Sequence, residues 1–202
     1  GVAHGISLVS DQDVVAFTGD STFFHSVMPA LVNCKFNDER APLVVVLDNA
    51  ITAMTGHQPN PGSGFTGTGE KVEPVRIESV VKAFEVELRI SSSFSQKQLI
   101  EALQELKGIK GPKVLVSRGE CRLLTRRRFR AKGIAMPVYQ ISREECTKCG
   151  VCTDNFACPA IIKTTGPGGE PVYSIDPDVC TGCAVCMQIC PEGAIHIVKR
   201  EG

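Results

Sequence analysis

The chain of 202 residues is long enough for one large domain or two small ones, and its 22 acidic residues balance its 22 basic ones. This balance gives no global charge to attract nucleic acid or an anionic membrane, and the longest apolar runs, such as residues 43–47, are far too short to cross a bilayer. We therefore expect no nucleic-acid or membrane partner. Of the ten cysteines, only Cys34 and Cys121 lie outside the last third, which favours two domains.

The first two thirds of the chain alternate short apolar runs with helical patterns. Strands are predicted at 13–18, 43–47, 86–90 and 114–116, and helices at 21–36, 79–84 and 95–106. Because the strands are apolar on both faces and are separated by helices, the sequence predicts an α/β domain with a parallel sheet of buried strands. Its chemistry is expected at the carboxyl ends of those strands.

Polar residues follow the first two predicted strands. Gly19, Asp20 and Ser21 end the first strand, and Asp48 and Asn49 end the second. A carboxylate and an amide oxygen on neighbouring tips, with a backbone carbonyl and a diphosphate, give Mg²⁺ the oxygen shell that it requires. Each dipeptide alone is also typical of turns and caps. As a pair they favour a metal–diphosphate site.

A long loop, residues 52–69, follows the second tip. Loops of this length inside a compact domain are usually lids or disordered insertions, and we expect this one to cover a cofactor or substrate and to order when it binds. His57 in the loop and His25 in the preceding helix lie near the expected site. Each fits a structural hydrogen bond as well as a contact with a ligand, so the catalytic residues stay unassigned.

A basic run precedes Pro137 and comprises Arg126, Arg127, Arg128, Arg130 and Lys132. Such a run is typical of a solvated linker or helix face. The alternatives to a solvated surface are that the run docks against an acidic partner or binds the phosphates of CoA. The run marks the expected boundary between a domain of residues 1–132 and one of residues 133–202.

The other eight cysteines form two matched sets, each a Cys-x-x-Cys-x-x-Cys triplet followed by a Cys-Pro pair. They are Cys146, Cys149, Cys152 and Cys158, and then Cys180, Cys183, Cys186 and Cys190. This spacing is typical of 4Fe–4S clusters, and in two-cluster ferredoxins the fourth cysteine binds the other cluster. The sequence therefore predicts one cluster on Cys146, Cys149, Cys152 and Cys190, and another on Cys180, Cys183, Cys186 and Cys158.

An internal repeat supports this crossed arrangement. Residues 137–141 (Pro-Val-Tyr-Gln-Ile) match residues 171–175 (Pro-Val-Tyr-Ser-Ile), and a cysteine triplet follows each at the same offset. One departure is that five residues, where three are usual, separate Cys152 from Cys158. We expect a widened loop that still returns a thiolate. Loss of that ligand, leaving a three-iron cluster or none, is the alternative.

Two other chemistries use paired cysteines. Disulfides require an oxidising compartment, and nothing resembling a secretory signal precedes these cysteines. Zinc takes four ligands as two Cys-x-x-Cys pairs, whereas these are triplets that each have a Cys-Pro. We therefore expect iron–sulfur clusters in a cytoplasmic protein.

The strand tips resemble a known family. The run from Gly19 to Thr22 and, about thirty residues later, the run from Asp48 to Pro59 (Asp-Asn-Ala-Ile-Thr-Ala-Met-Thr-Gly-His-Gln-Pro) are similar to the thiamine-diphosphate site of 2-oxoacid:ferredoxin oxidoreductases. With the two-cluster module behind it, the whole chain resembles the C-terminal portion of the α-subunit of the indolepyruvate-oxidising members. Ser21 departs from the broader signature, where Gly is usual, and would narrow the approach to the diphosphate or donate a hydrogen bond to it.

By this resemblance, Asp20, Asn49 and the carbonyl of Ile51 hold Mg²⁺, and Gly19, Ser21 and Thr22 line the diphosphate. The implied reaction is the oxidative decarboxylation of an aryl 2-oxoacid to its acyl-CoA, with electrons passing through two 4Fe–4S clusters to an external ferredoxin. The resembling enzymes bind the aminopyrimidine in a separate domain that is not found in this sequence. We therefore expect a fragment, and a second (β) subunit.

Two other functions compete with this one. An electron carrier would use the α/β domain only as a docking scaffold. A nucleotide-linked reductase is disfavoured, because no Gly-x-Gly-x-x-Gly follows the first strand.

Overall fold

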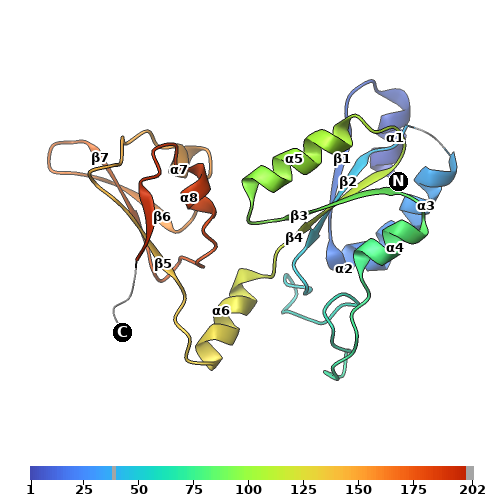
Figure 1. Cartoon of the computed structure of the whole chain (residues 1–202), viewed down its shortest axis with the longest axis horizontal. Coiled ribbons are helices and arrows are strands. Elements are labelled where there is room, and N and C mark those ends of the chain that lie inside the picture. The colour runs from blue at the N-terminus through green and yellow to red at the C-terminus, as the bar shows by residue number, and fades with distance from the viewer. Residues whose placement is uncertain (38–39, 199–202) are drawn as a thin grey trace. The chain divides into compact units, whose positions relative to one another are not determined.

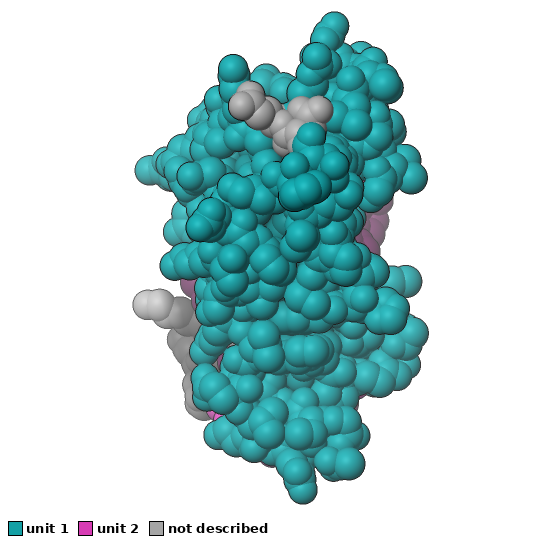
Figure 2. All heavy atoms as spheres, turned by 90° about the vertical axis from the view of Figure 1, so that its right-hand side faces the viewer, with its two compact units in different colours: residues 1–121 teal, residues 122–202 magenta. Residues whose placement is uncertain are grey.

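The computed structural model describes residues 1–37 and 40–198, and the chain divides into two compact units, residues 1–121 and 122–202 (Figures 1 and 2). The division lies earlier than the boundary expected after residue 132. Helix α6, Arg122–Ala131, which carries most of the basic run, therefore begins unit 2. None of the helices in the described residues is long and apolar enough to span a membrane.

Unit 1 is built on a four-stranded parallel sheet in the order β1-β2-β4-β3 (Figure 1). Its strands are β1 (Val15–Gly19), β2 (Leu43–Asp48), β3 (Glu87–Ser92) and β4 (Lys113–Arg118). Helices return the chain between them: α4 (Ile77–Ala83) precedes β3, and α5 (Gln96–Lys107) connects β3 to β4. This confirms the predicted α/β domain. A further helix that the sequence did not predict, α1 (Val2–Val9), opens the chain.

The central strands are buried on both faces. Val114 and Val116 pack with residues of α3 (Met28–Asn37) and α4 on one face, while Leu115 packs with Leu106 of α5 on the other. All four side chains are fully buried, which explains why these strands are uniformly apolar in sequence. The prediction of burial is wrong for β1, because β1 is an edge strand and the Phe17 side chain is 70% exposed.

The helix after β1 is continuous but changes its pitch. It begins as α2 (Asp20–Thr22), widens into a π-helical turn, η1 (Phe23–Val27), and continues as α3 (Met28–Asn37). Pro29 lies directly after the wide turn, and it has no N–H to donate to the preceding turn. The predicted helix at 21–36 is confirmed, with this irregularity added.

After α6, the described part of unit 2 contains two short antiparallel ribbons and two short helices. Strand β5 (Val138–Ile141) pairs with β8 (Ile195–Val198), and β6 (Ile161–Thr165) pairs with β7 (Pro171–Ile175). The helices α7 (Val151–Asp154) and α8 (Val185–Ile189) each begin inside a cysteine triplet. The predicted repeat is present in the backbone: Cys146 N donates to Ser142 O at 3.1 Å, and at the matching position Cys180 N donates to Asp176 O at 2.9 Å.

Candidate functional site

The carboxyl ends of β1 and β2 bring Asp20 beside the turn that follows Asp48. The strands pair in parallel with Gly19 opposite Leu47, so both tips reach the same edge. Asp20 is only 3% exposed, and its Oδ1 accepts a hydrogen bond from Ser21 N at 2.8 Å. Its Oδ2 is buried without a hydrogen-bond partner. An unpaired buried carboxylate oxygen is destabilising, and it fits a ligand atom reserved for a cation.

The pKa of the Asp20 carboxyl reflects this setting. Burial raises the pKa, and the nearby Asp48 carboxylate adds to the effect. The Ser21 N–H, the Asn60 side chain and the Ala50 N–H lower it. Three segments that are distant in sequence therefore meet at this carboxylate.

The turn after β2 is held in place from both sides. Asn49 Oδ1 accepts from Ile51 N at 3.1 Å, and Asp48 Oδ1 accepts from Ala50 N at 3.2 Å. Ala50 adopts a left-handed conformation with φ 61°. The end of β4 completes the support, since Gly119 N donates to Asp48 O at 2.9 Å. Asn49 Oδ1 retains a second acceptor position, as a metal ligand requires.

Asn60 is a site residue that the sequence analysis missed. The loop containing it is folded into tight turns, with a bridge between Thr52 and Gln58. Asn60 is 7% exposed; its Oδ1 accepts from Gly62 N at 2.8 Å, while its Nδ2 is buried without a partner. An Asn-Pro-Gly stretch predicts a turn, and it gives no signal that the amide faces Asp20.

Asp48 is part of an ionic network with Arg118 and Glu78. Arg118 Nε donates to Asp48 Oδ2 at 2.7 Å, and the two Nη atoms of Arg118 bind both Glu78 oxygens at 3.2 and 2.6 Å. Hydrogen bonding to Arg118 is the main reason that the pKa of Glu78 lies below its ordinary value. The network ties β2, β4 and α4 together at the site edge. A cavity of about 230 Å³ adjoins it, lined by Asp48, Ala50, Gly62, Val75, Arg76, Ile77, Arg118 and Glu120.

The other predicted residues of this site lie around the start of the helix. A Cβ added at Gly19 would meet nothing within 4 Å, so the space above the tip is open. Ser21 is half-buried and Thr22 is exposed in the first turn. His25 is exposed, whereas the Nε2 atom of His57 lies 3.7 Å from Cys121 Sγ. The loop after the second tip is folded into turns, and its role as a lid stays a prediction.

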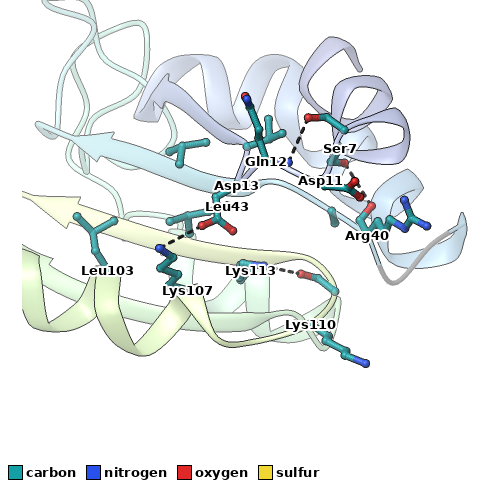
Figure 3. Close-up of a pocket in the computed structure, with 15 residues that line it drawn as sticks. Ser7, Asp11, Gln12, Asp13, Arg40, Leu43, Leu103, Lys107, Lys110 and Lys113 are labelled. Atoms are coloured by element: carbon teal, nitrogen blue, oxygen red, sulfur yellow. Dashed lines mark hydrogen bonds and ion pairs between the residues drawn. The ribbon is translucent and has the colours of Figure 1, made fainter.

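A second cavity, of about 410 Å³, lies at the opposite edge of the sheet (Figure 3). It opens where β1, β2 and β4 begin, and Val15, Leu43 and Lys113 are among its lining residues. In Figure 3 the Lys107 ammonium points toward Asp13, and their charged atoms are 3.3 Å apart. The residues predicted to line a diphosphate lie at the carboxyl ends of the strands, so this cavity is separate from the predicted site.

The first predicted cluster set comes together in unit 2. A cavity is lined by all four of its thiols, Cys146, Cys149, Cys152 and Cys190, together with the apolar side chains of Ile141 and Ile195. Burial raises the pKa of the Cys152 thiol, and the other three thiols of the set add to this effect. Cys190 thus lines the same cavity as the triplet of the other repeat, and the crossed ligand assignment stays a prediction.

The thiols of the second predicted set influence the buried Cys186. Cys186 is 7% exposed, and burial together with Cys183, Cys158 and Cys180 raises the pKa of its thiol to about 11. Cys158, after the widened loop, is among the thiols that act on Cys186, and its role as the fourth ligand stays a prediction. Across the described residues, no three His, Cys, Asp or Glu side chains lie close enough to share one metal ion.

The basic run is only partly a solvated surface. Arg130 is exposed, as expected, but Arg126 of α6 donates through Nη1 to the Asp178 carbonyl at 2.8 Å. In unit 2, His196 is exposed, as its position in an alternating strand indicates, and its Nε2 contacts Glu145 Oε2.

Comparison with known proteins gives matches to both units. The family model described as thiamine pyrophosphate enzyme, C-terminal TPP binding domain, matches residues 1–117, and that of a 4Fe-4S binding domain matches residues 173–196. The chain is 40% identical over 163 residues to the indolepyruvate oxidoreductase subunit IorA of Archaeoglobus fulgidus (80% of this chain, 26% of the relative). It is 37% identical over 219 residues to that of Pyrococcus horikoshii (100% and 33%). The chain thus spans about a third or less of these relatives.

Proposed function

From the premise that this chain belongs to the thiamine pyrophosphate enzymes through their C-terminal TPP-binding domain, we propose that it forms part of a 2-oxoacid:ferredoxin oxidoreductase. The proposed reaction is the oxidative decarboxylation of an aryl 2-oxoacid of the indolepyruvate type to its acyl-CoA. Electrons then leave through two 4Fe–4S clusters to an external ferredoxin. The relatives named indolepyruvate oxidoreductase subunit support the substrate class and the need for a second subunit.

One observation carries the cofactor assignment: the buried, unpartnered Oδ2 of Asp20 beside the Asn49 turn. Asp20 Oδ2, Asn49 Oδ1 and the Ile51 carbonyl would supply three of the hard oxygen ligands that Mg²⁺ requires, and the diphosphate would supply further oxygens. The helix that begins at Asp20 offers backbone N–H groups to the diphosphate. When bound, thiamine diphosphate supplies the carbanion stabilisation that decarboxylation needs.

The residues around the cation site orient it and keep it dry. Arg118 neutralises Asp48, so the full negative charge of Asp20 remains available to the cation. Asp20 and Asn60 are both buried, and burial strengthens an ionic contact by lowering the local dielectric constant. In unit 2, the two groups of four thiols are the proposed ligands of the clusters.

Thermal unfolding with cofactor tests the thiamine site. We expect thiamine diphosphate with Mg²⁺ at about 100 times its Kd to stabilise unit 1 by about 2.7 kcal/mol, since only the folded state binds it. Asp20→Ala should abolish this protection, and the control Asp11→Ala, an exposed carboxylate at the other edge of the sheet, should retain it. A melting curve that the cofactor leaves unchanged would instead support a docking scaffold.

Metal analysis tests the clusters separately. Two four-iron sites predict about eight irons and eight inorganic sulfides per chain after anaerobic reconstitution. About four irons would leave one thiol group without a cluster, and zinc in both groups would refute electron transfer through this unit.

A further inference from the structure

The second ligand turn, residues 180–186, is held by an arginine of the helix that opens unit 2. Arg122 donates from Nε and Nη2 to the Thr181 carbonyl at 3.1 and 3.0 Å, and from Nη2 to the Gly182 carbonyl at 2.9 Å. Both carbonyls lie between Cys180 and Cys183. A planar guanidinium that binds adjacent carbonyls fixes their orientation, which a flexible lysine ammonium does much less well.

The same turn is packed closely on another side. Gly182 has φ 66°, and a Cβ added there would lie 2.9 Å from Pro137 Cγ. Gly182 is therefore required both by its backbone conformation and by the close approach of Pro137. With Arg122 bound to its carbonyls, the turn is restrained by two separate contacts.

The first ligand turn, residues 146–152, has the same backbone conformation as the second but is more exposed to solvent. Lys148 has φ 60° at the position that matches Gly182. Thr147, Lys148 and Cys149 are all exposed, whereas Thr181 and Cys183 are half-buried and Gly182 is buried. The two turns thus share one geometry and differ in their contact with α6 and with solvent.

The Arg122 charge acts in the same region as the second thiol group. Burial raises the pKa of Tyr139, and the thiols of Cys186, Cys180 and Cys183 raise it further. Arg122 lowers it, so the guanidinium and these three thiols all act on one buried hydroxyl group. A fixed positive charge near a cluster favours its reduced form, because reduction adds one negative charge to the cluster.

We propose that Arg122 is a positioning residue for the cluster held by Cys180, Cys183, Cys186 and Cys158, and that it raises the reduction potential of that cluster alone. Arg122 does so by its charge and by holding the ligand turn. The two clusters are therefore electrically inequivalent despite the repeat. This inference rests on the proposed function in one respect, namely that both thiol groups hold a four-iron cluster.

A redox titration of the full reconstituted chain, followed by electron paramagnetic resonance, tests the inference. Arg122→Gln should shift one cluster to a more negative potential and leave the other unchanged. The expected shift is about tenfold in the ratio of reduced to oxidised cluster at a fixed potential, which corresponds to about 59 mV for a one-electron couple. Cys149→Ser, which perturbs only the first cluster, identifies the signal that must not move.

Two further variants separate charge from structure. Arg122→Lys keeps the charge, so the potential should stay near that of the wild type while iron is lost from the second cluster faster on heating. Arg130→Gln removes an equal charge from the exposed far end of α6, about 12 Å along the helix, and should change neither potential. Equal shifts of both clusters, a shift of the first cluster only, or no shift in Arg122→Gln would overturn the inference.

The iron content of the wild type distinguishes this failure from failure of the proposed function. With about eight irons present, an unchanged potential in Arg122→Gln refutes only the role of Arg122. A wild-type chain without iron on Cys180, Cys183 and Cys186 refutes that role together with the two-cluster proposal.

Discussion

The two units differ in how much of each candidate site is formed by the protein alone. In unit 1, the Asn49 turn is fixed by its own hydrogen bonds and by the end of β4, above a sheet with an aliphatic core on each face. In unit 2, the core centres on Tyr139, Ile161, Ile195 and Cys186, and four other cysteine side chains pack against it. The thiols are thus both the proposed ligands and much of the core.

This difference indicates two relations between cofactor and fold. Unit 1 has enough apolar burial that we expect it to fold without its cofactor and to bind thiamine diphosphate and Mg²⁺ afterwards, with Asp20 already in place. Unit 2 is small, and its cysteines raise one another's pKa values, so assembly of the clusters is expected to contribute directly to folding. The predictions below test whether this contrast holds.

The largest effect is expected from removing a cluster ligand in the core of unit 2. Cys186→Ala should destabilise unit 2 by about 4 kcal/mol or more, because it removes a buried ligand and with it the second cluster. Calorimetry should show the loss of one unfolding transition while that of unit 1 remains. Cys34→Ala, a buried cysteine of unit 1 outside both thiol groups, is the control and should leave the cluster absorbance intact. Coupled loss of both transitions would contradict independent units.

A smaller effect of opposite sign is expected at the unit 1 site. Asp20→Asn removes a buried charge that has an unpartnered oxygen, so it should stabilise the cofactor-free unit by about 1–3 kcal/mol. The same change should abolish protection by thiamine diphosphate and Mg²⁺. Urea unfolding with and without cofactor measures both effects. If Asp20→Asn instead destabilises the cofactor-free form, Asp20 is a structural residue whose carboxylate oxygens both accept hydrogen bonds in solution.

The contrast also shows which features the sequence could predict. Local signals were sufficient for the strands, for the helix predicted over residues 95–106 and for the repeat. The helix α5 is capped by Ser95, whose Oγ accepts from Gln98 N at 3.4 Å. In the two ligand turns, Lys148 and Gly150 take positive φ angles, as do Gly182 and Ala184 at matching positions. Such features depend on residues that are close in sequence.

Other features depend on contacts between distant residues. Arg118 reaches Asp48 and Glu78 across separations of 70 and 40 residues, and Asn60 reaches Asp20 from a loop whose sequence predicts only turns. Arg122 lies four residues before the basic run, and nothing in its sequence context marks a contact with the second ligand turn. No periodicity or spacing marks these residues, because their roles arise only when the tips of the sheet and the ligand turns are assembled.

The smallest effect is expected from the ionic network that supports the preformed site. Arg118 holds the pKa of Glu78 below its ordinary value of 4.5, so the interaction contributes fully above about that pH and is lost as the pH falls through the lowered folded-state pKa. Glu78→Gln should therefore cost unit 1 about 0.5–1 kcal/mol at pH 7, a modest value because the Arg118 side chain is 37% exposed and screened. In urea unfolding the difference from wild type should vanish in acid and shrink at high salt. Glu101→Gln, on the exposed surface of α5, removes the same charge outside the network and should not reproduce this dependence on pH and Arg118. The contrary result is a difference in free energy of unfolding between Glu78→Gln and wild type that grows as the pH falls. It would show that the network destabilises the strand tips, so that other contacts must hold the Asn49 turn in place.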